Sequence, residues 1–374
     1  MGSSNWLSSR ERVLLALQHE ETDQVPIAMV CSGINEPTRE LFDQYLKDEH
    51  SCDLAAYLNS VLDIMTVAPE YIGPPLKERE DFWGVRRAPI QQGGGGSYDE
   101  IEYYPLMTAD SVDDVCRHVW PQPEWFDYDG LPTQIDRVNA NGGPYAIMAL
   151  NCNVFETSWY TRGFEQAFMD LALESELFEL IMRKVADFYY EHARRTLEAA
   201  HGRIDLIFTA DDIGQQNGLL MSLAMWEKCI KPHHARINDM IHEHGARVIY
   251  HTDGAVMKAV PGLIDMGIDV LQALQFDAEG MDAHLLKETY GDRLCFQGGV
   301  SVQKTLPFGS PDSVRAEVKE RIAVLGRNGG YILGPSHAIQ AGTPLENIFT
   351  MFETASRCRN NKQWSTNKTD AGDA

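Results

Sequence analysis

The fold is decided by residues 246–285, ARVIYHTDGAVMKAVPGLIDMGIDVLQALQFDAEGMDAHL. A short apolar run at residues 248–250 predicts a buried strand, and it stops abruptly at the polar segment HTDG, residues 251–254. A helical segment follows, and a second apolar run at residues 268–274 ends on Gln275. This order of strand, polar end, helix and strand is typical of a parallel sheet whose chemistry lies at the carboxyl ends of its strands.

The same alternation continues on both sides of this stretch. Short apolar runs predict further strands at residues 25–30, 62–67, 145–150, 204–209, 294–296 and 331–333. Helices are predicted at residues 8–19, 36–48, 51–60, 162–171, 175–200, 225–244, 313–325 and 345–357. No glycine fingerprint of a dinucleotide-binding fold accompanies them. The chain of 374 residues therefore predicts a (β/α)8 TIM barrel with an N-terminal helical and hairpin elaboration, and an open doubly wound sheet is the alternative.

One segment, residues 75–107, interrupts the alternation. Aromatic and β-branched residues flank the glycine run at residues 93–96, which predicts a β-hairpin with glycines at its tip. A phosphate-binding loop is disfavoured because no helix or lysine follows the glycines. We expect residues 1–374 to form a single domain, with a disordered polar tail at residues 359–374.

Composition excludes several classes of protein. The formal net charge of −23 would repel nucleic acid and anionic membranes, and we find no apolar run of about 18 residues that would span a bilayer. The seven cysteines are scattered without a CxxC pair, so a disulfide framework or an all-cysteine zinc site is not expected. The N-terminus lacks the apolar core of a signal peptide, which indicates a cytoplasmic location.

Polar side chains follow the predicted strands at their carboxyl ends. In a barrel these ends converge on one mouth, so residues distant in sequence would form one site. We expect three of these side chains to contact a cofactor, namely Asp211, Gln275 and Gln297.

A metal site is one interpretation of His251, Asp253 and His337. Imidazole and carboxylate are zinc ligands, and three of them would leave one coordination position open. A hydrogen-bonded His–Asp network is the alternative. The adjacent Asp211 and Asp212 could supply a general base, bind a cation or cap the following helix.

An acid and two aromatic residues follow the strand predicted at residues 145–150. Glu156, Trp159 and Tyr160 would line the same mouth and suit a flat organic substrate, or they could simply pack in the core. Four histidines on the helix predicted at residues 225–244 are expected at the surface: His233, His234, His242 and His244.

Several short motifs together resemble the uroporphyrinogen decarboxylase-like superfamily, over residues 8–358. They are RERVLLAL at 10–17 with Asp23 and Pro26, WYTRGFE at 159–165, DDIG at 211–214, HTDG at 251–254, FQGG at 296–299, and GYILGPSHAIQ at 330–340 followed by Thr343, Pro344, Glu346 and Asn347. The resemblance implies a (β/α)8 barrel. It also implies either decarboxylation of uroporphyrinogen or zinc-dependent methyl exchange with a corrinoid.

Two departures from the superfamily's motifs bear on that choice. True decarboxylases hold their carboxylate-rich substrate with an arginine-rich N-terminal motif, whereas residues 27–35, IAMVCSGIN, contain no arginine. The coenzyme M methyltransferases bind zinc through His-x-Cys and a distant Cys. Here His251 matches the histidine, and Asp253 and His337 stand at the two cysteine positions, which gives a harder ligand set suited to an oxygen leaving group.

The resemblance therefore implies a corrinoid-dependent methyltransferase acting on a small O-methyl donor, such as a phenyl methyl ether. His251, Asp253 and His337 would hold zinc, and Glu156 or Asp212, with Tyr160 beside them, would supply the proton. The sequence contains no D-x-H-x-x-G motif, so the corrinoid would arrive on a partner protein, and a homodimer is expected. The alternatives are a decarboxylase of uroporphyrinogen or of a smaller carboxylic acid, and a barrel that binds a tetrapyrrole or corrinoid without catalysis.

Overall fold

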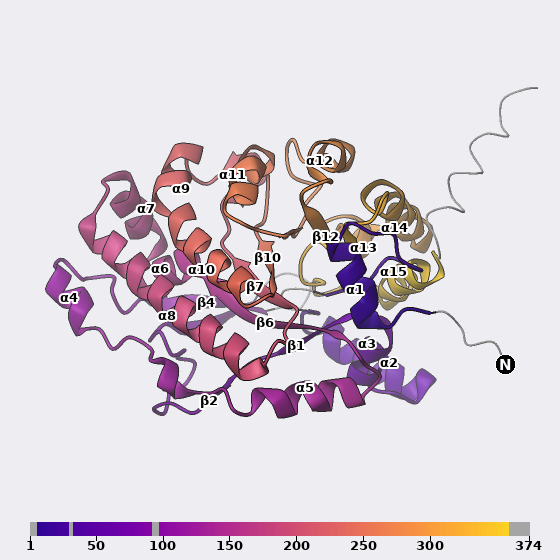
Figure 1. Cartoon of the computed structure of the whole chain (residues 1–374), viewed down its shortest axis with the longest axis horizontal. Helices are drawn as coiled ribbons and strands as arrows, with labels where there is room; N and C mark the ends of the chain where they lie inside the picture. The colour runs from indigo at the N-terminus through magenta and orange to yellow at the C-terminus, as the bar shows by residue number, and fades with distance from the viewer. Residues whose placement is uncertain (1–5, 30–32, 92–96, 359–374) are drawn as a thin grey trace, which may run out of the picture.

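The computed structural model describes residues 6–29, 33–91 and 97–358 (Figure 1). Within these ranges the centre of the molecule is a seven-stranded parallel sheet, ordered β1–β6–β7–β10–β11–β12–β13. Its strands are β1 (Ile64–Val67), β6 (Ala146–Asn153), β7 (Leu206–Ala210), β10 (Arg247–His251), β11 (Val270–Gln272), β12 (Cys295–Val300) and β13 (Tyr331–Pro335). The three antiparallel pairs are β2 (Glu70–Tyr71) with β5 (Phe126–Asp127), β3 (Arg86–Gln91) with β4 (Ser97–Tyr103), and β8 (Gly214–Gln215) with β9 (Gly218–Leu219).

Helices connect and cover the strands. Those that precede β6 are α1 (Ser9–Leu17), α2 (Thr38–His50), α3 (Leu54–Val61), α4 (Val112–Arg117), the 3-10 turn η2 (Pro123–Trp125) and α5 (Leu131–Ala140). Those that follow β6 are α6 (Val154–Arg162), α7 (Phe164–Ala172), α8 (Glu176–Ala200), α9 (Leu223–Cys229), α10 (Lys231–Glu243), η3 (Met257–Ala259), α11 (Val260–Asp265), α12 (Ala283–Tyr290), α13 (Thr305–Phe308), α14 (Pro311–Leu325) and α15 (Leu345–Arg357). The predicted helix at residues 225–244 is thus two helices that meet at Ile230, with Pro232 in the first turn of the second.

The expected closed eight-stranded barrel is only partly formed. The sheet is parallel and curled like a TIM barrel, but the segment predicted as its first strand makes only an isolated bridge in its described part, between Ile27 and Leu333. On the other side, the Ile27 carbonyl accepts the backbone N–H of Asp63 at 2.8 Å. The Ile27 N–H donates to the Asp63 side chain at 2.8 Å, and Pro26 has no N–H to give. Towards β13, the Ala28 N–H donates to the Leu333 carbonyl at 2.9 Å and the Leu333 N–H donates to the Pro26 carbonyl at 2.8 Å. Towards β1, the Asp63 carboxylate replaces a backbone carbonyl as the acceptor of the Ile27 N–H.

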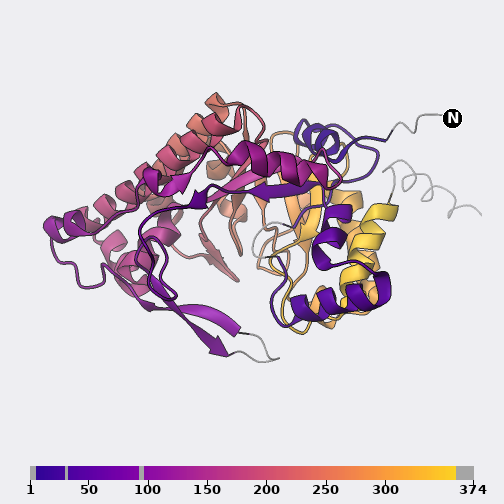
Figure 2. The same cartoon turned by 90° about the horizontal axis from the view of Figure 1, so that it is seen from below.

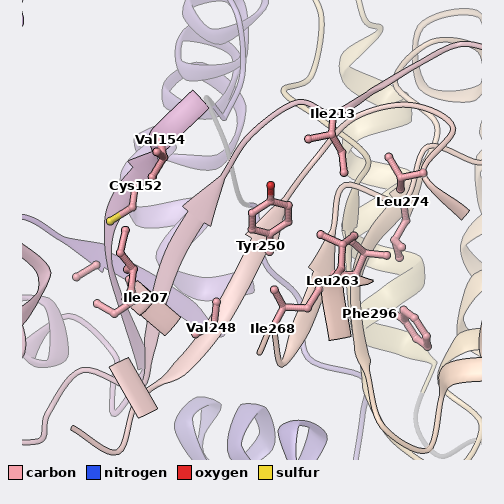
Figure 3. Packing of buried hydrophobic residues seen from close by; sticks show 14 of the residues in the cluster. Cys152, Val154, Ile207, Ile213, Val248, Tyr250, Leu263, Ile268, Leu274 and Phe296 are labelled. Carbon is pink, nitrogen blue, oxygen red and sulfur yellow. The ribbon is translucent and has the colours of Figure 1, made fainter. Parts of the chain in front are cut away.

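Two layers of core result from the alternation of side chains along the strands. One set of residues faces the inside of the curled sheet and packs beneath α1, and it includes Ile249, Phe208 and Val13. The opposite set packs outward against the helices, where Figure 3 shows Ile207, Val248, Tyr250, Leu263, Ile268 and Phe296 together. Helix α1 therefore closes the amino end of the sheet, which leaves the carboxyl ends for the site.

The predicted hairpin at residues 75–107 is present as the antiparallel pair β3 and β4, which extends away from the main sheet in Figure 2. Its predicted glycine tip at residues 93–96 and the predicted tail at residues 359–374 lie outside the described residues. Among the helices that the structure describes, none combines the length and apolarity needed to cross a membrane.

Candidate metal centre and acid site

The three predicted metal ligands lie together at the carboxyl ends of β10 and β13. His251 is the last residue of β10, Asp253 follows it by two residues, and His337 lies two residues beyond β13. One ligand atom from each falls within 4.8 Å of the others. Nε2 of His251 is 3.9 Å from Asp253 Oδ1, and Nε2 of His337 is 3.7 Å from Asp253 Oδ2. Two ligands of a tetrahedral zinc are roughly 3.3 Å apart, so small side-chain movements would close the set around an ion.

Neighbouring groups orient these ligands. Nδ1 of His251 is hydrogen-bonded to the side-chain oxygen of Gln272, which directs Nε2 towards Asp253. Gln272 is the residue paired with His251 in the register of β10 and β11. Its role was not predicted, because the strand was expected to extend to residue 274 and Gln272 then lay inside it. The backbone N–H of Asp253 donates to Asp212 Oδ1 at 2.8 Å, which fixes the loop beyond β10.

The electrostatics of the set favour a cation. Oδ1 of Asp253 is buried and has no hydrogen-bond partner among the described residues. Burial, followed by the charge of Asp212, raises the pKa of Asp253 despite the two histidines, and burial lowers the pKa of His337. The buried Oδ1 of Asp253 thus lacks a donor among the described residues, and a bound cation would supply a positive partner for it. The donor set fits zinc.

Glu156 is a buried acid at the start of α6, close to this cluster. Its Oε2 accepts from Asn153 Nδ2 at 2.6 Å and its Oε1 accepts from the Tyr160 hydroxyl at 3.0 Å. Burial, and then the charges of Asp212 and Asp211, raise the pKa of Glu156 to about 8. Glu156 therefore holds a proton at neutral pH, as a general acid must. The role of Asn153 as a hydrogen-bond partner of Glu156 was not predicted from the sequence.

Asp211 and Asp212 follow β7 but have different surroundings. Asp211 is fully buried, and its carboxylate accepts the backbone N–H groups of Phe155 and Glu156 at 2.9 and 2.8 Å. It thus caps the first turn of α6 and fixes Glu156, instead of presenting an oxygen that a cofactor could reach. Asp212 is more exposed, and its Oδ1 is 3.6 Å from Nε2 of His251.

His234 was expected at the surface, and this expectation is wrong. It is fully buried, and its Nε2 lies 2.5 Å from Asp211 Oδ2. A signal existed, because His234 shares the helical spacing of Ile237, Asn238 and Ile241, which form the buried face of α10. On this face, His234 contacts Asp211 just beyond the end of β7.

Gln275 and Gln297, expected to contact a cofactor, bond to the backbone. Oε1 of Gln275 accepts from Gly254 N at 2.8 Å, and Nε2 of Gln297 donates to Ala28 O at 3.1 Å. Both side chains are buried, and Gln297 has no exposed surface. Their geometry indicates that they brace the loop beyond β10 and the segment beside β13.

A cavity of about 790 Å³ lies beside Glu156, at the carboxyl ends of β1 and β6. Several aromatic side chains line it, with Tyr160 and Asn153 on the side next to Glu156. Tyr160 lines the predicted mouth, whereas Trp159 packs edge-on against it with ring centroids 4.3 Å apart and is not part of the lining. The further aromatic and charged lining residues are Tyr71, Asp81, Phe82, Trp83, Arg87, Phe126, Phe188, Tyr189 and His192.

Comparisons with known proteins agree with this architecture. A family model described as uroporphyrinogen decarboxylase (URO-D) matches residues 135–358. A solved methyltransferase from Methanosarcina mazei is 20% identical with a TM-score of 0.64, over 94% of this chain and 98% of that chain. A sugar phosphate isomerase/epimerase from Parabacteroides distasonis is 10% identical with a TM-score of 0.38, over 90% of this chain and 96% of that chain. The likeness to the methyltransferase concerns the fold alone, and the likeness to the isomerase/epimerase is too weak to bear on it. None of the curated proteins matches the chain.

Proposed function

The chain belongs to the uroporphyrinogen decarboxylase family, and from this we propose that it is a methyltransferase that moves a methyl group from a small O-methyl donor to a corrinoid carried by a separate protein. The observation that carries the proposal is the set of His251, Asp253 and His337, with its buried and unpartnered carboxylate oxygen. The fold likeness to a methyltransferase agrees with it.

The substrate side of the site is poorly suited to uroporphyrinogen. Arg87 is the one arginine or lysine among the residues that line the large cavity, and much of the remaining wall is aromatic or aliphatic. Residues 27–35, where the decarboxylases carry arginines, have none. A substrate with eight carboxylates would therefore lack partners, whereas a small aromatic ether would find an apolar wall.

The residues have distinct roles in this proposal. His251, Asp253 and His337 would hold zinc, which when bound supplies a Lewis acid that polarises the oxygen of the methyl donor. Glu156, whose pKa is raised to about 8, would supply the proton that the donor oxygen takes up as its bond to the methyl group breaks. Tyr160 and Asn153 orient the Glu156 carboxyl through their hydrogen bonds. Asp211 fixes the turn of α6 that carries it.

The test combines metal analysis with methyl transfer to cob(I)alamin, followed by its absorbance under anaerobic conditions. We expect about one zinc per chain in the wild type, and loss of both zinc and transfer in Asp253→Ala and His337→Ala. His284→Ala is the control, because this histidine is exposed on α12 and remote from the cluster in sequence. Methyl transfer without any corrinoid would contradict the proposal. Release of CO₂ from a carboxylic acid without cobalt would replace it with decarboxylation.

A further inference from the structure

The cavity beside Glu156 has the features of a binding site for an aromatic ligand. At about 790 Å³ it lies within the range of small-molecule pockets. Phe82 and Trp83 come from the segment before β3, and Phe188 and Tyr189 come from α8, so the aromatic walls are built by elements far apart in the chain. Such walls favour a flat apolar ligand.

One charged side chain in this wall is held in place while most of its donors stay available. Arg87 Nη1 donates to Asp81 Oδ2 at 2.6 Å, and the guanidinium lies over the Tyr160 ring, 5.3 Å from its centroid. Within the described residues, this is the one hydrogen bond that the Arg87 side chain makes, although a guanidinium has five N–H donors. Arg87 can therefore bind a second anion without releasing the first.

Asp81 acts as an anchor for this arginine. Its other oxygen, Oδ1, accepts the backbone N–H groups of Trp83 and Val85 at 2.9 and 3.1 Å. Asp81 therefore belongs to the turn and fixes the direction of Arg87. The histidine in the wall adds no second cation, because burial lowers the pKa of His192 to about 4 and its Nδ1 bonds to the Tyr128 hydroxyl at 2.6 Å.

The Tyr160 side chain links Arg87 in the cavity wall to the buried Glu156. Arg87 lies over the face of its ring, and Glu156 meets its hydroxyl. Asn153 and Tyr160, the two hydrogen-bond partners of Glu156, line the cavity, and Glu156 itself lies behind them. A flat ligand with its anionic group at Arg87 could therefore extend towards Asn153 and Tyr160.

We propose that this cavity selects an aromatic acid that carries a methoxy group, with its carboxylate bound by the Arg87 guanidinium and its ether oxygen on the side of Asn153 and Tyr160, the hydrogen-bond partners of Glu156. Planar guanidinium and carboxylate groups pair through two parallel hydrogen bonds, which favours an acid over a neutral analogue. This inference rests on the proposed function for the identity of the reacting group, and it adds the class of the methyl donor.

The test is calorimetric titration of the zinc-loaded full chain, without corrinoid, using 4-methoxybenzoate and its neutral analogue 4-methoxybenzamide. We expect the wild type to bind the acid at least tenfold more tightly than the amide. Arg87→Met should weaken acid binding at least tenfold and leave amide binding unchanged, and Arg87→Lys should retain part of the preference. Arg203→Met is the matched control, because Arg203 pairs with Asp136 away from the cavity lining.

The outcomes separate this inference from the proposed function. Equal wild-type affinity for acid and amide would overturn the inference, and so would an equal loss of both in Arg87→Met. Efficient methyl transfer from neutral aryl ethers and not from the acid would overturn it while leaving the proposed function intact. Tight acid binding that depends on Arg87, without methyl transfer to cob(I)alamin, would support Arg87 as the carboxylate-binding residue and would refute the proposed function.

Discussion

Replacing Glu156 with glutamine keeps the shape of a buried side chain and removes its ability to ionise. In the wild type this carboxyl lies in a dry site between Asn153 and Tyr160, with the charges of Asp212 and Asp211 nearby. Its pKa in the folded protein is raised from the ordinary value of 4.5 to about 8. Ionisation of Glu156 therefore opposes folding, and the variant removes this penalty.

The sign and size of the effect follow from proton linkage. Between pH 4.5 and pH 8 the unfolded chain has lost the Glu156 proton and the folded chain has kept it, so the free energy of unfolding falls as pH rises. Below pH 4.5 both states hold the proton and the penalty vanishes. It reaches about 2 kcal/mol at pH 6 and levels off near 5 kcal/mol above pH 8. Glu156→Gln should thus match the wild type at pH 4 and exceed its stability at pH 9.

Guanidinium denaturation followed by tryptophan fluorescence, on protein dialysed against a chelator, would measure this difference at several pH values. Glu279→Gln is the control, because Glu279 is exposed and should change stability equally at every pH. The same Glu156→Gln protein should lose about 10²- to 10⁴-fold in the rate of methyl transfer, since it has no proton to give. A stability difference that does not vary between pH 5 and pH 9 would mean that Glu156 is ionised in the folded protein, and the acid role would fall.

Two further changes test the fold beneath the site. Asp63→Asn should destabilise the protein by about 3 kcal/mol, because the buried Asp63 carboxylate lies 2.6 Å from Arg12 Nη1 and its loss removes one charge partner of that arginine. Denaturant midpoints would measure this, with Lys47→Met as the control because its ion pair with Asp43 is exposed. Equal midpoints for the two variants would refute the prediction. Ile249→Ala should cost about 2 to 5 kcal/mol, because its fully buried side chain fills the layer beneath α1, and an unchanged thermal midpoint would show that this layer is not tightly packed.

The local sequence pattern was sufficient to predict most of the strands and helices and the grouping of one set of site residues. Apolar runs followed by polar residues predicted the strands at β6, β7, β10, β12 and β13, because a buried parallel strand leaves a clear signal and its end is a change of polarity. His251, Asp253 and His337 could be placed together from the sequence, since parallel strands bring their carboxyl ends to one edge. The acid at Glu156 was also identified, but its raised pKa was not.

Properties that depend on contacts between distant residues were decided only by the tertiary structure. The barrel is not closed by a full eighth strand, and the Ile27 N–H bonds to the Asp63 carboxylate, a contact between residues far apart in the chain. Asp211 became a buried cap and partner of His234 because α10 turns that face inward. The aromatic cavity with Arg87 needs the segment before β3 to fold back over α8. A sequence specifies which groups can be buried or charged, whereas the partner that each group finds, and hence its pKa and its chemistry, is set by packing.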